Sequence, residues 1–197
     1  LSGETRSPLA GSIRILGTNA IGLNPTARRS LGAVFVPEER IGHAAVADMT
    51  LVDNSYLTGD TRMNFSHRGL IDWPAVTRFT QKVVQNFDVR TTGVDALASS
   101  LSGGNLQKFI VGREILQQPS LLVVSQPTWG VDAGAAAAIH EEIQRLVSAG
   151  AAVLMISQDL DEVFLLSHRI AVISQGTLSA AMPIDEITPE DIGLLMG

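Results

Sequence analysis

The sequence lacks cysteine altogether and contains one tyrosine and only two lysines, Lys82 and Lys108. Without cysteine the chain has no disulfide bonds and no thiolate metal ligands. No apolar run approaches the ~20 residues that a membrane-spanning helix needs. The net charge of −6 gives no electrostatic footprint for nucleic acid, so no nucleic-acid partner is expected. The four histidines have no metal-ligand spacing, and no metal site is predicted.

The 197 residues are enough for one domain or slightly more. From residue 120 onward, apolar segments alternate with helical patterns. We predict strands at residues 121–124, 153–156 and 170–173, helices around 139–147 and at 160–166, an antiparallel edge strand at 177–181, and a terminal helix after Thr188. Continuous apolar strands that alternate with amphipathic helices imply a mostly parallel sheet covered on both faces.

The first half of the chain has a different pattern of predicted strands and helices. Short strands are predicted at residues 12–16 and 32–36, with a helical turn at 26–29 between them. Strand signals then stop, and residues 51–57 and 73–87 have helical spacing. We therefore predict an α/β core made of residues 1–40 and 119–197, and a helical subdomain made of residues 41–118.

Residues 101–108 read Leu-Ser-Gly-Gly-Asn-Leu-Gln-Lys. Gly103 and Gly104 at the start of a predicted helix leave backbone N–H groups bare at its positive end, which is a ready site for an anion. Ser102 can cap this helix and also donate to a phosphate oxygen. The alternative is a capped core helix that follows a glycine turn.

Nucleotide-binding proteins with such a sheet usually carry the loop G-x-x-x-x-G-K-[ST], whose lysine contacts the phosphates. Lys82 and Lys108 both follow glutamine, so this sequence does not contain the motif. The strand at 121–124 runs into Ser125 and Gln126, where phosphoryl transfer needs an Asp for Mg²⁺ and a carboxylate for water. A hydroxyl holds Mg²⁺ less well than a carboxylate, and losing a general base costs roughly 10²–10⁴-fold in rate. No intact catalytic residue is expected.

These motifs together resemble the nucleotide-binding domain of ABC transporters over almost the whole chain. Residues 101–108 are similar to the signature motif, 121–126 to the Walker B strand with its catalytic carboxylate, and 130–134 to the D-loop. Residues 156–162 resemble the switch segment, with Gln158 where a histidine is usual. Residues 35–40 resemble the Q-loop region, with Glu38 in place of the glutamine. The implied fold is a P-loop NTPase-like α/β fold with a helical subdomain.

Residues 36–40, 101–108 and 126–132 further resemble importers of simple sugars and nucleosides. In that branch one polypeptide carries two nucleotide-binding domains, and the second often has an altered catalytic site. The resemblance implies that this chain is the second, C-terminal domain and that the Walker A loop lies just upstream of Leu1. A bacterial transport ATPase of this kind couples ATP hydrolysis to solute import.

The resemblance also implies a mechanism. Two domains sandwich ATP head to tail, and Ser102, Gly103, Gly104 and Asn105 would cap the ATP held by the partner domain. Asp132 would communicate across the interface; the alternative is that it only caps the helix after it. ATP and Mg²⁺ are the cofactors of the full assembly, with weak or no binding by this chain alone.

The implied partners are the N-terminal nucleotide-binding domain of the same polypeptide, membrane permease subunits and, indirectly, a solute-binding protein. By analogy, the region of residues 51–57 docks the permease at the cytoplasmic face of the membrane. Two rival hypotheses remain: a non-catalytic regulatory or interaction module, and a head domain of an SMC or DNA-repair ABC ATPase. The second needs coiled-coil insertions and usually has a basic surface, neither of which this sequence contains.

Overall fold

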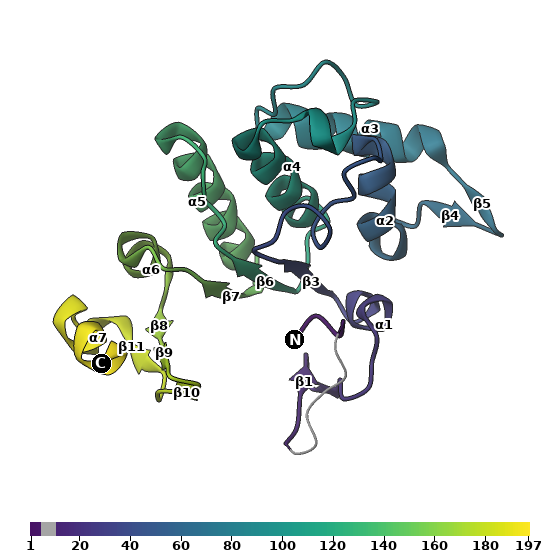
Figure 1. The fold of residues 1–197 in the computed structure, drawn as a ribbon. Coiled ribbons are helices and arrows are strands. Elements are labelled where there is room, and N and C mark those ends of the chain that lie inside the picture. Colours follow the sequence, from purple (N-terminus) through teal and green to yellow (C-terminus); the bar gives the residue numbers. More distant parts are fainter. Residues whose placement is uncertain (5–10) are drawn as a thin grey trace. The chain divides into compact units, whose positions relative to one another are not determined.

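Figure 1 shows the computed structural model, which describes residues 1–4 and 11–197. The chain forms two compact units, Leu1–Ile156 and Ser157–Gly197. The larger unit contains a parallel sheet, the helices packed around it and the motif at residues 101–108. The smaller unit is built from short strands and two helices.

A three-stranded parallel sheet is the centre of the larger unit. Its strands are β3 (Ala33–Val36), β6 (Leu121–Ser125) and β7 (Ala152–Ile156), in the order β3-β6-β7. All of β3 and the middle of β6 are buried, as expected for strands covered on both faces, but no residue of β7 is buried, so this expectation is wrong for β7. Segments far apart in the sequence thus lie side by side, because β3 pairs with β6 in the register Val34 to Leu122.

Helices cover one face of this sheet. Helix α5 (Ala133–Ser148) buries Ile139, Ile143 and Leu146, which follow the predicted helical spacing, and it packs on β7. Helix α4 (Gly103–Ile115) packs against both α5 and β3. Both helices stand on the same side of the strands in Figure 1.

The opposite face is covered near β3 by the N-terminal segment. Strands β1 (Arg14–Ile15) and β2 (Thr18–Asn19) form a hairpin, and α1 (Pro25–Ser30) leads into β3. Ile15 and Ala20 pack with sheet residues Ala33, Phe35 and Val123 in one apolar cluster. This cluster holds the N-terminal hairpin on the sheet.

Three helices and a hairpin lie between β3 and β6. They are α2 (Leu51–Met63), the hairpin of β4 (Ser66–His67) and β5 (Leu70–Ile71), α3 (Trp73–Asn86), the 3-10 turn Ala98–Ser100, and α4. The predicted helix at 51–57 is therefore longer, and the expectation that strand signals stop in this region is wrong because of the hairpin. The division into a core and a helical subdomain stays a prediction.

The smaller unit corrects one strand. Residues 170–173 do not form a single strand of a parallel sheet; they end β8 (Arg169–Ile170) and begin β9 (Ile173–Ser174). Strand β8 pairs antiparallel with β11 (Met182–Pro183), and β9 pairs antiparallel with β10 (Thr177–Leu178). Gln175 and Gly176 both adopt positive φ and form the turn of the β9–β10 hairpin, while β8 pairs with another strand, so the two halves of the predicted strand belong to different pairings.

Two helices and a 3-10 turn complete this unit. They are α6 (Leu160–Leu166), the 3-10 turn Ile184–Glu186 and α7 (Pro189–Met196). Thr188 and Asp191 form a capping box at the start of α7, which agrees with the predicted terminal helix. Ile170, Val172, Ile187 and Ile192 form the core of the unit.

Candidate functional site at the start of helix α4

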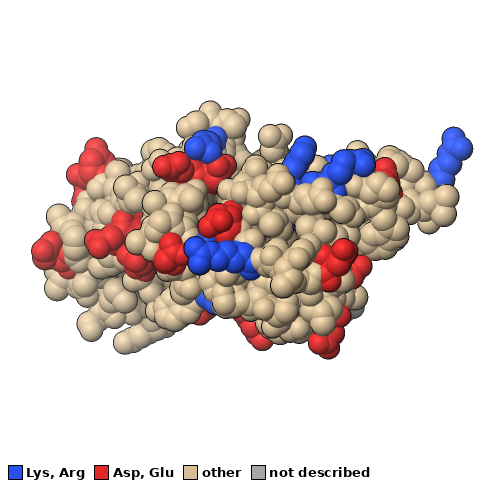
Figure 2. All heavy atoms as spheres, turned by 90° about the horizontal axis from the view of Figure 1, so that it is seen from above, with Lys and Arg blue, Asp and Glu red and all other residues tan. Residues whose placement is uncertain are grey.

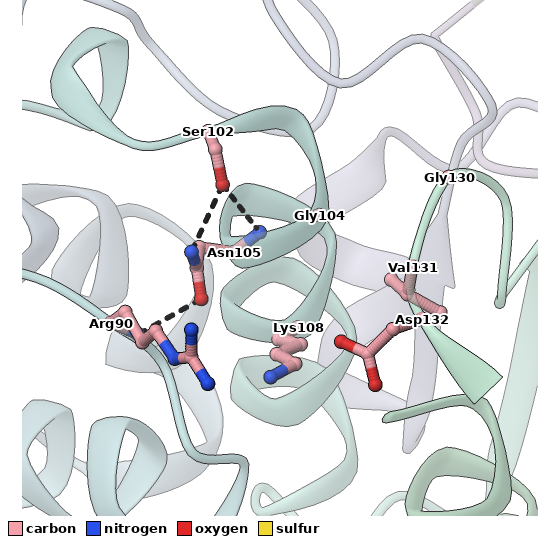
Figure 3. A pocket seen from close by; sticks show the side chains of 8 residues that line it. All are labelled: Arg90, Ser102, Gly104, Asn105, Lys108, Gly130, Val131 and Asp132. Carbon is pink, nitrogen blue, oxygen red and sulfur yellow. Dashed lines mark hydrogen bonds between the residues drawn. The ribbon is translucent and has the colours of Figure 1, made fainter. Parts of the chain in front are cut away.

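Ser102 caps helix α4 and is tied to the first turn of that helix. Its Oγ accepts from the Asn105 backbone N at 3.5 Å and from Asn105 Nδ2 at 2.9 Å. The Oδ1 of Asn105 in turn accepts from the backbone N of Arg90 at 2.9 Å, as Figure 3 shows. Ser102 and Gly103 remain exposed to solvent. The start of α4 is therefore ordered and accessible at the same time.

A pocket of about 400 Å³ opens at this helix start. It is lined by Arg90, Ser102, Gly104, Asn105, Lys108, Gly130, Val131 and Asp132. Figure 3 shows the signature residues and Arg90 on one side, the turn 130–132 on the other, and Lys108 between them. Residues 102–105 and the turn 130–132, separated by more than twenty residues in the sequence, thus form one concave surface.

The two sides of the pocket lie close together at Gly104. A Cβ on Gly104 would lie 3.0 Å from the carbonyl oxygen of Gly130. The neighbour is backbone, which cannot swing aside as a side chain does. Gly130 itself has a φ of +70°, a conformation that favours glycine. The geometry of the pocket therefore favours glycine at both positions.

The charged groups of the pocket are Arg90, Lys108 and Asp132. Lys108 Nζ donates to the backbone O of Asp88 at 3.1 Å and lies 3.5 Å from the Oδ2 of the same residue. Asp132 caps α5, because its Oδ1 accepts from the Ala135 backbone N at 3.0 Å. That hydrogen bond, and then the charge of Lys108, lower the pKa of Asp132. Asp132 is therefore a carboxylate at neutral pH, and its capping role is shown.

The turn after β6 is held by the signature helix. Gln107, buried on α4, donates from Nε2 to the backbone O of Gln126 at 3.1 Å and of Pro127 at 2.9 Å. Gln126 has a φ of +50°, and its backbone N donates to the O of Ile156 at 2.8 Å. Ser125 is the last residue of β6. The polar strand end predicted from the sequence is thus built into the sheet and linked to α4.

A second pocket, of about 500 Å³, lies next to the first. It is lined by Glu38, Glu39, Arg40 and Trp129. An Nη2 hydrogen bond to the backbone O of Trp129 ties Arg40 to the turn after β6. Partial burial lowers the pKa of the Arg40 guanidinium. Glu38, which the resemblance to the Q-loop region implies as a nucleotide-binding residue, lines this second pocket and not the signature pocket.

The predicted site residues therefore divide into groups. Ser102, Gly104, Asn105 and Asp132 line one pocket, and Gly103 adjoins it. Gln158 belongs to the smaller unit, which is described by itself. Sequence reasoning did not assign Arg90 or Arg40 to the site. Arg90 carries no sequence signal, whereas Lys108 follows Asn105 by three residues and so lies on the same helix face.

Two further findings bear on the site. Among residues 1–4 and 11–197, no cluster of three or more His, Asp or Glu side chains is suited to hold a metal ion. No helix in that part of the chain is long and apolar enough to cross a membrane. The face shown in Figure 2 carries both acidic and basic side chains.

Solved structures with the same architecture identify the fold. The structure superposes with a TM-score of 0.74 on a dimeric ATP-binding cassette bound to ADP and Pi, at 17% identity over 90% of this chain and 75% of the other. A nucleotide-free ATP-binding cassette from an ABC transporter gives 0.72 at 19% identity, over 100% of this chain and 80% of the other. The chain has the fold of an ABC ATPase. The predicted fold class is thereby confirmed.

Proteins similar in sequence to this chain are named as import ATP-binding proteins. The chain is 37% identical over 187 residues to the nucleoside import ATP-binding protein NupA of Lactococcus lactis, covering 95% of the chain and 37% of the relative. The guanosine import protein NupO of Bacillus subtilis is 35% identical with the same coverage. A ribose import protein, RbsA 1 of Streptomyces avermitilis, is 35% identical over 92% of the chain and 34% of the relative.

The chain thus spans little more than a third of the length of these curated relatives. No family model matches it.

Proposed function

We propose that this chain is a nucleotide-binding domain of an ABC importer for simple sugars or nucleosides. Three relatives named for nucleoside, guanosine and ribose import align with more than nine-tenths of it. The ABC ATPase fold supports the same conclusion. In this proposal a second nucleotide-binding domain on the same polypeptide binds, through its own Walker A loop, the ATP that this chain caps. Permease subunits then place the assembly at the cytoplasmic face of the membrane, and a solute-binding protein is only an indirect partner through the permease.

The signature pocket is proposed to cap ATP held by the partner domain. The observation that carries this role is the exposed, capped start of α4 facing the turn 130–132 across an open pocket. The first turn of α4 contains no acidic side chain, and the pocket lining has two cations, Arg90 and Lys108, against the one carboxylate of Asp132. These features suit the terminal phosphate of ATP, because helix N-termini and cationic side chains both favour anions.

Within this role each residue has a defined task. Ser102 Oγ and the free backbone N–H groups of the first turn would contact the phosphate, and Asn105 holds Ser102 in place through the 2.9 Å hydrogen bond. Gly103 and Gly104 keep the surface free of side chains. Asp132 would face the partner domain from the other wall of the pocket. When bound, ATP supplies the free energy of phosphoryl transfer to the transport cycle.

This chain's own strand end is proposed not to hydrolyse ATP. Ser125 and Gln126 take the places of a metal-binding Asp and a catalytic carboxylate, and Gln158 that of the switch histidine. A neutral hydroxyl and an amide do not fit Mg²⁺ as carboxylates do, so no step is assigned to a metal here. Catalysis would occur at the other composite site, to which this chain contributes the cap.

The permease contact is proposed to lie on exposed parts of the helices between β3 and β6. Leu51 and Val52 at the start of α2 are buried, so they are not available for docking. Leu57, Leu70 and Trp73 are exposed and apolar. Within α2 the proposed docking region is therefore smaller than the predicted segment 51–57, because the start of that segment is buried. Outside α2 it also includes exposed residues of the β4–β5 hairpin and of α3.

A charged substitution in the cap tests the proposal. In the full-length protein with its permease, Ser102→Arg is expected to reduce ATP turnover at least about tenfold, because the long side chain fills the space proposed for the phosphate. Ser148→Arg, at the exposed end of α5, is the matched control and is expected to leave turnover unchanged. Equal turnover of Ser102→Arg and wild type would reject the cap.

A further inference from the structure

Arg40 lies where three segments of the larger unit meet. It follows β3 in the sequence, and its Nη2 donates to the backbone O of Trp129. A Cβ on Gly103, the first residue of α4, would lie 2.9 Å from Arg40 Nη1. A Cβ on Gly130 would lie 3.1 Å from Arg40 Nη2. The guanidinium is therefore in contact with both the start of α4 and the turn before α5.

Helix stabilisation does not account for this position. A cation is disfavoured at the positive N-terminal end of a helix. The charge of Arg40 thus works against its place beside Gly103, and the hydrogen bond to Trp129 is what holds it there. The side chain packs against two glycines, where any larger residue would displace it.

The loop that carries Arg40 is itself anchored to α4 at a second point. Arg113, fully buried near the other end of α4, donates from Nη2 to the backbone O of Ala44 at 2.8 Å. Between these points the loop is closed on itself, because the Ala45 backbone N donates to the O of Arg40 at 2.7 Å. The loop is therefore fixed to α4 by Arg113 and to the turn 126–130 by Arg40.

We propose that Arg40 is a positioning residue that holds the signature turn, residues 102–105, and the turn 126–130 at a fixed separation. Gln107 fixes the buried side of the second turn through the carbonyls of Gln126 and Pro127. Arg40 fixes its open side through the carbonyl of Trp129. Together they set the width of the pocket between Gly104 and Gly130. Any effect of Arg40 on ATP binding rests on the proposed capping function, because Arg40 would act only through the shape of the pocket.

Hydrogen exchange of the full-length protein without nucleotide tests the positioning directly. The backbone N of Trp129 donates to Gln126 O, and that of Val131 to Thr128 O, both at 3.2 Å. Arg40→Met is expected to speed exchange of these two amides at least about threefold, because local opening becomes easier. Arg40→Lys keeps the charge and one donor and is expected to restore part of the protection. Arg78→Met, at an exposed position on α3, is the matched control.

Steady-state kinetics separate positioning from a general loss of structure. Arg40→Met is expected to raise the KM for ATP about tenfold while kcat falls less than threefold, the pattern of lost binding. The urea midpoint of unfolding is expected to stay at the wild-type value. Unchanged exchange at Trp129 and Val131, or a kcat loss with KM unchanged, overturns the role of Arg40. The exchange experiment contains no nucleotide, so its result tests the positioning role of Arg40 alone. The proposed capping function is tested separately by the turnover of Ser102→Arg.

Discussion

At the scale of single residues, Asn105 is the most informative member of the site. Its Nδ2 donates to Ser102 Oγ, and its Oδ1 accepts from the Arg90 backbone. One side chain therefore fixes both the cap of α4 and the segment that brings Arg90 to the pocket. Gly104 is the second such residue, because it permits the two walls to lie close together.

A methyl group at Gly104 tests this close approach. Gly104→Ala is expected to lower ATP turnover of the full-length protein about tenfold, since the Cβ at 3.0 Å from the Gly130 carbonyl must push the turn away. Gly193→Ala is the matched control, because Gly193 lies in α7 with nothing within 4 Å of its Cβ position. That control is expected to raise the free energy of unfolding by about 0.5–1 kcal/mol. Wild-type turnover in Gly104→Ala would contradict this prediction, because it would show that the pocket accommodates a methyl group at this position.

Much of the residue-scale site follows from the sequence. Ser102 and Gly104 were predicted because a glycine pair after a capping serine has a local physical meaning at a helix start, and Asn105 was added by the resemblance to the signature motif. Asp132 lay in a predicted turn ahead of a helix. Arg40 was not predicted, because its contacts with Trp129 and Gly103 depend on which strands are neighbours, and that information is not local.

At the scale of elements, α4 is held in place by a buried charge cluster. Arg29 on α1 lies 2.7 Å from Glu114 on α4, and Arg113 Nε lies 3.0 Å from the same carboxylate. Burial alone would raise the pKa of Glu114, but Arg29 and Arg113 together lower it. Burial also lowers the pKa of Arg113, more than Glu114 raises it. The cluster joins α1 to the helix that carries the signature.

This cluster predicts acid sensitivity. Because the folded-state pKa of Glu114 is lowered, its contribution to stability is fully present above its unfolded pKa of about 4.3 and is lost as the pH falls through the lower, folded value. Glu114→Gln is expected to cost about 3 kcal/mol at pH 7, since two arginines lose their carboxylate. It should also flatten the decline below about pH 4. Urea unfolding between pH 3 and 7 measures both effects.

The matched control is Glu141→Gln on the exposed face of α5. Glu141 pairs with Arg145 at 3.3 Å, with both side chains about two-thirds exposed. Such surface pairs contribute at most about 0.5 kcal/mol. A Glu114→Gln loss no larger than this control contradicts the structural role assigned to the cluster.

The elements also show where sequence patterns stop being sufficient. Strand β6 and helices α5 and α6 were predicted because each has several residues of one periodicity. The hairpin β4–β5 was missed because each strand has two residues and the turn between them is Arg68-Gly69, not the more common Asn-Gly. The strand predicted at 170–173 was wrong for a related reason, since an apolar run of four residues does not reveal the break between β8 and β9.

At the scale of the whole molecule, the order of the strands determines how the site forms. Strand β3 pairs with β6, so the whole segment with α2, α3 and α4 is inserted between two neighbouring strands. The loop after β3 and the turn after β6 leave the sheet at the same edge because the strands are parallel. That topology brings Arg40, Trp129 and Gly103 together. The insert of helices was predicted from the change in sequence pattern after residue 40, whereas the pairing of β3 with β6 was not predicted.

The central claim is that residues 102–105 cap a nucleotide bound by a partner domain. Hydrogen exchange of the full-length protein, with and without a non-hydrolysable ATP analogue, tests it most directly. The account predicts that amides of residues 103–106 exchange at least about fivefold more slowly at saturating analogue, while those at the exposed C-terminal end of α5, around Ser148, are unchanged. Equal exchange at residues 103–106 in the two conditions would contradict it.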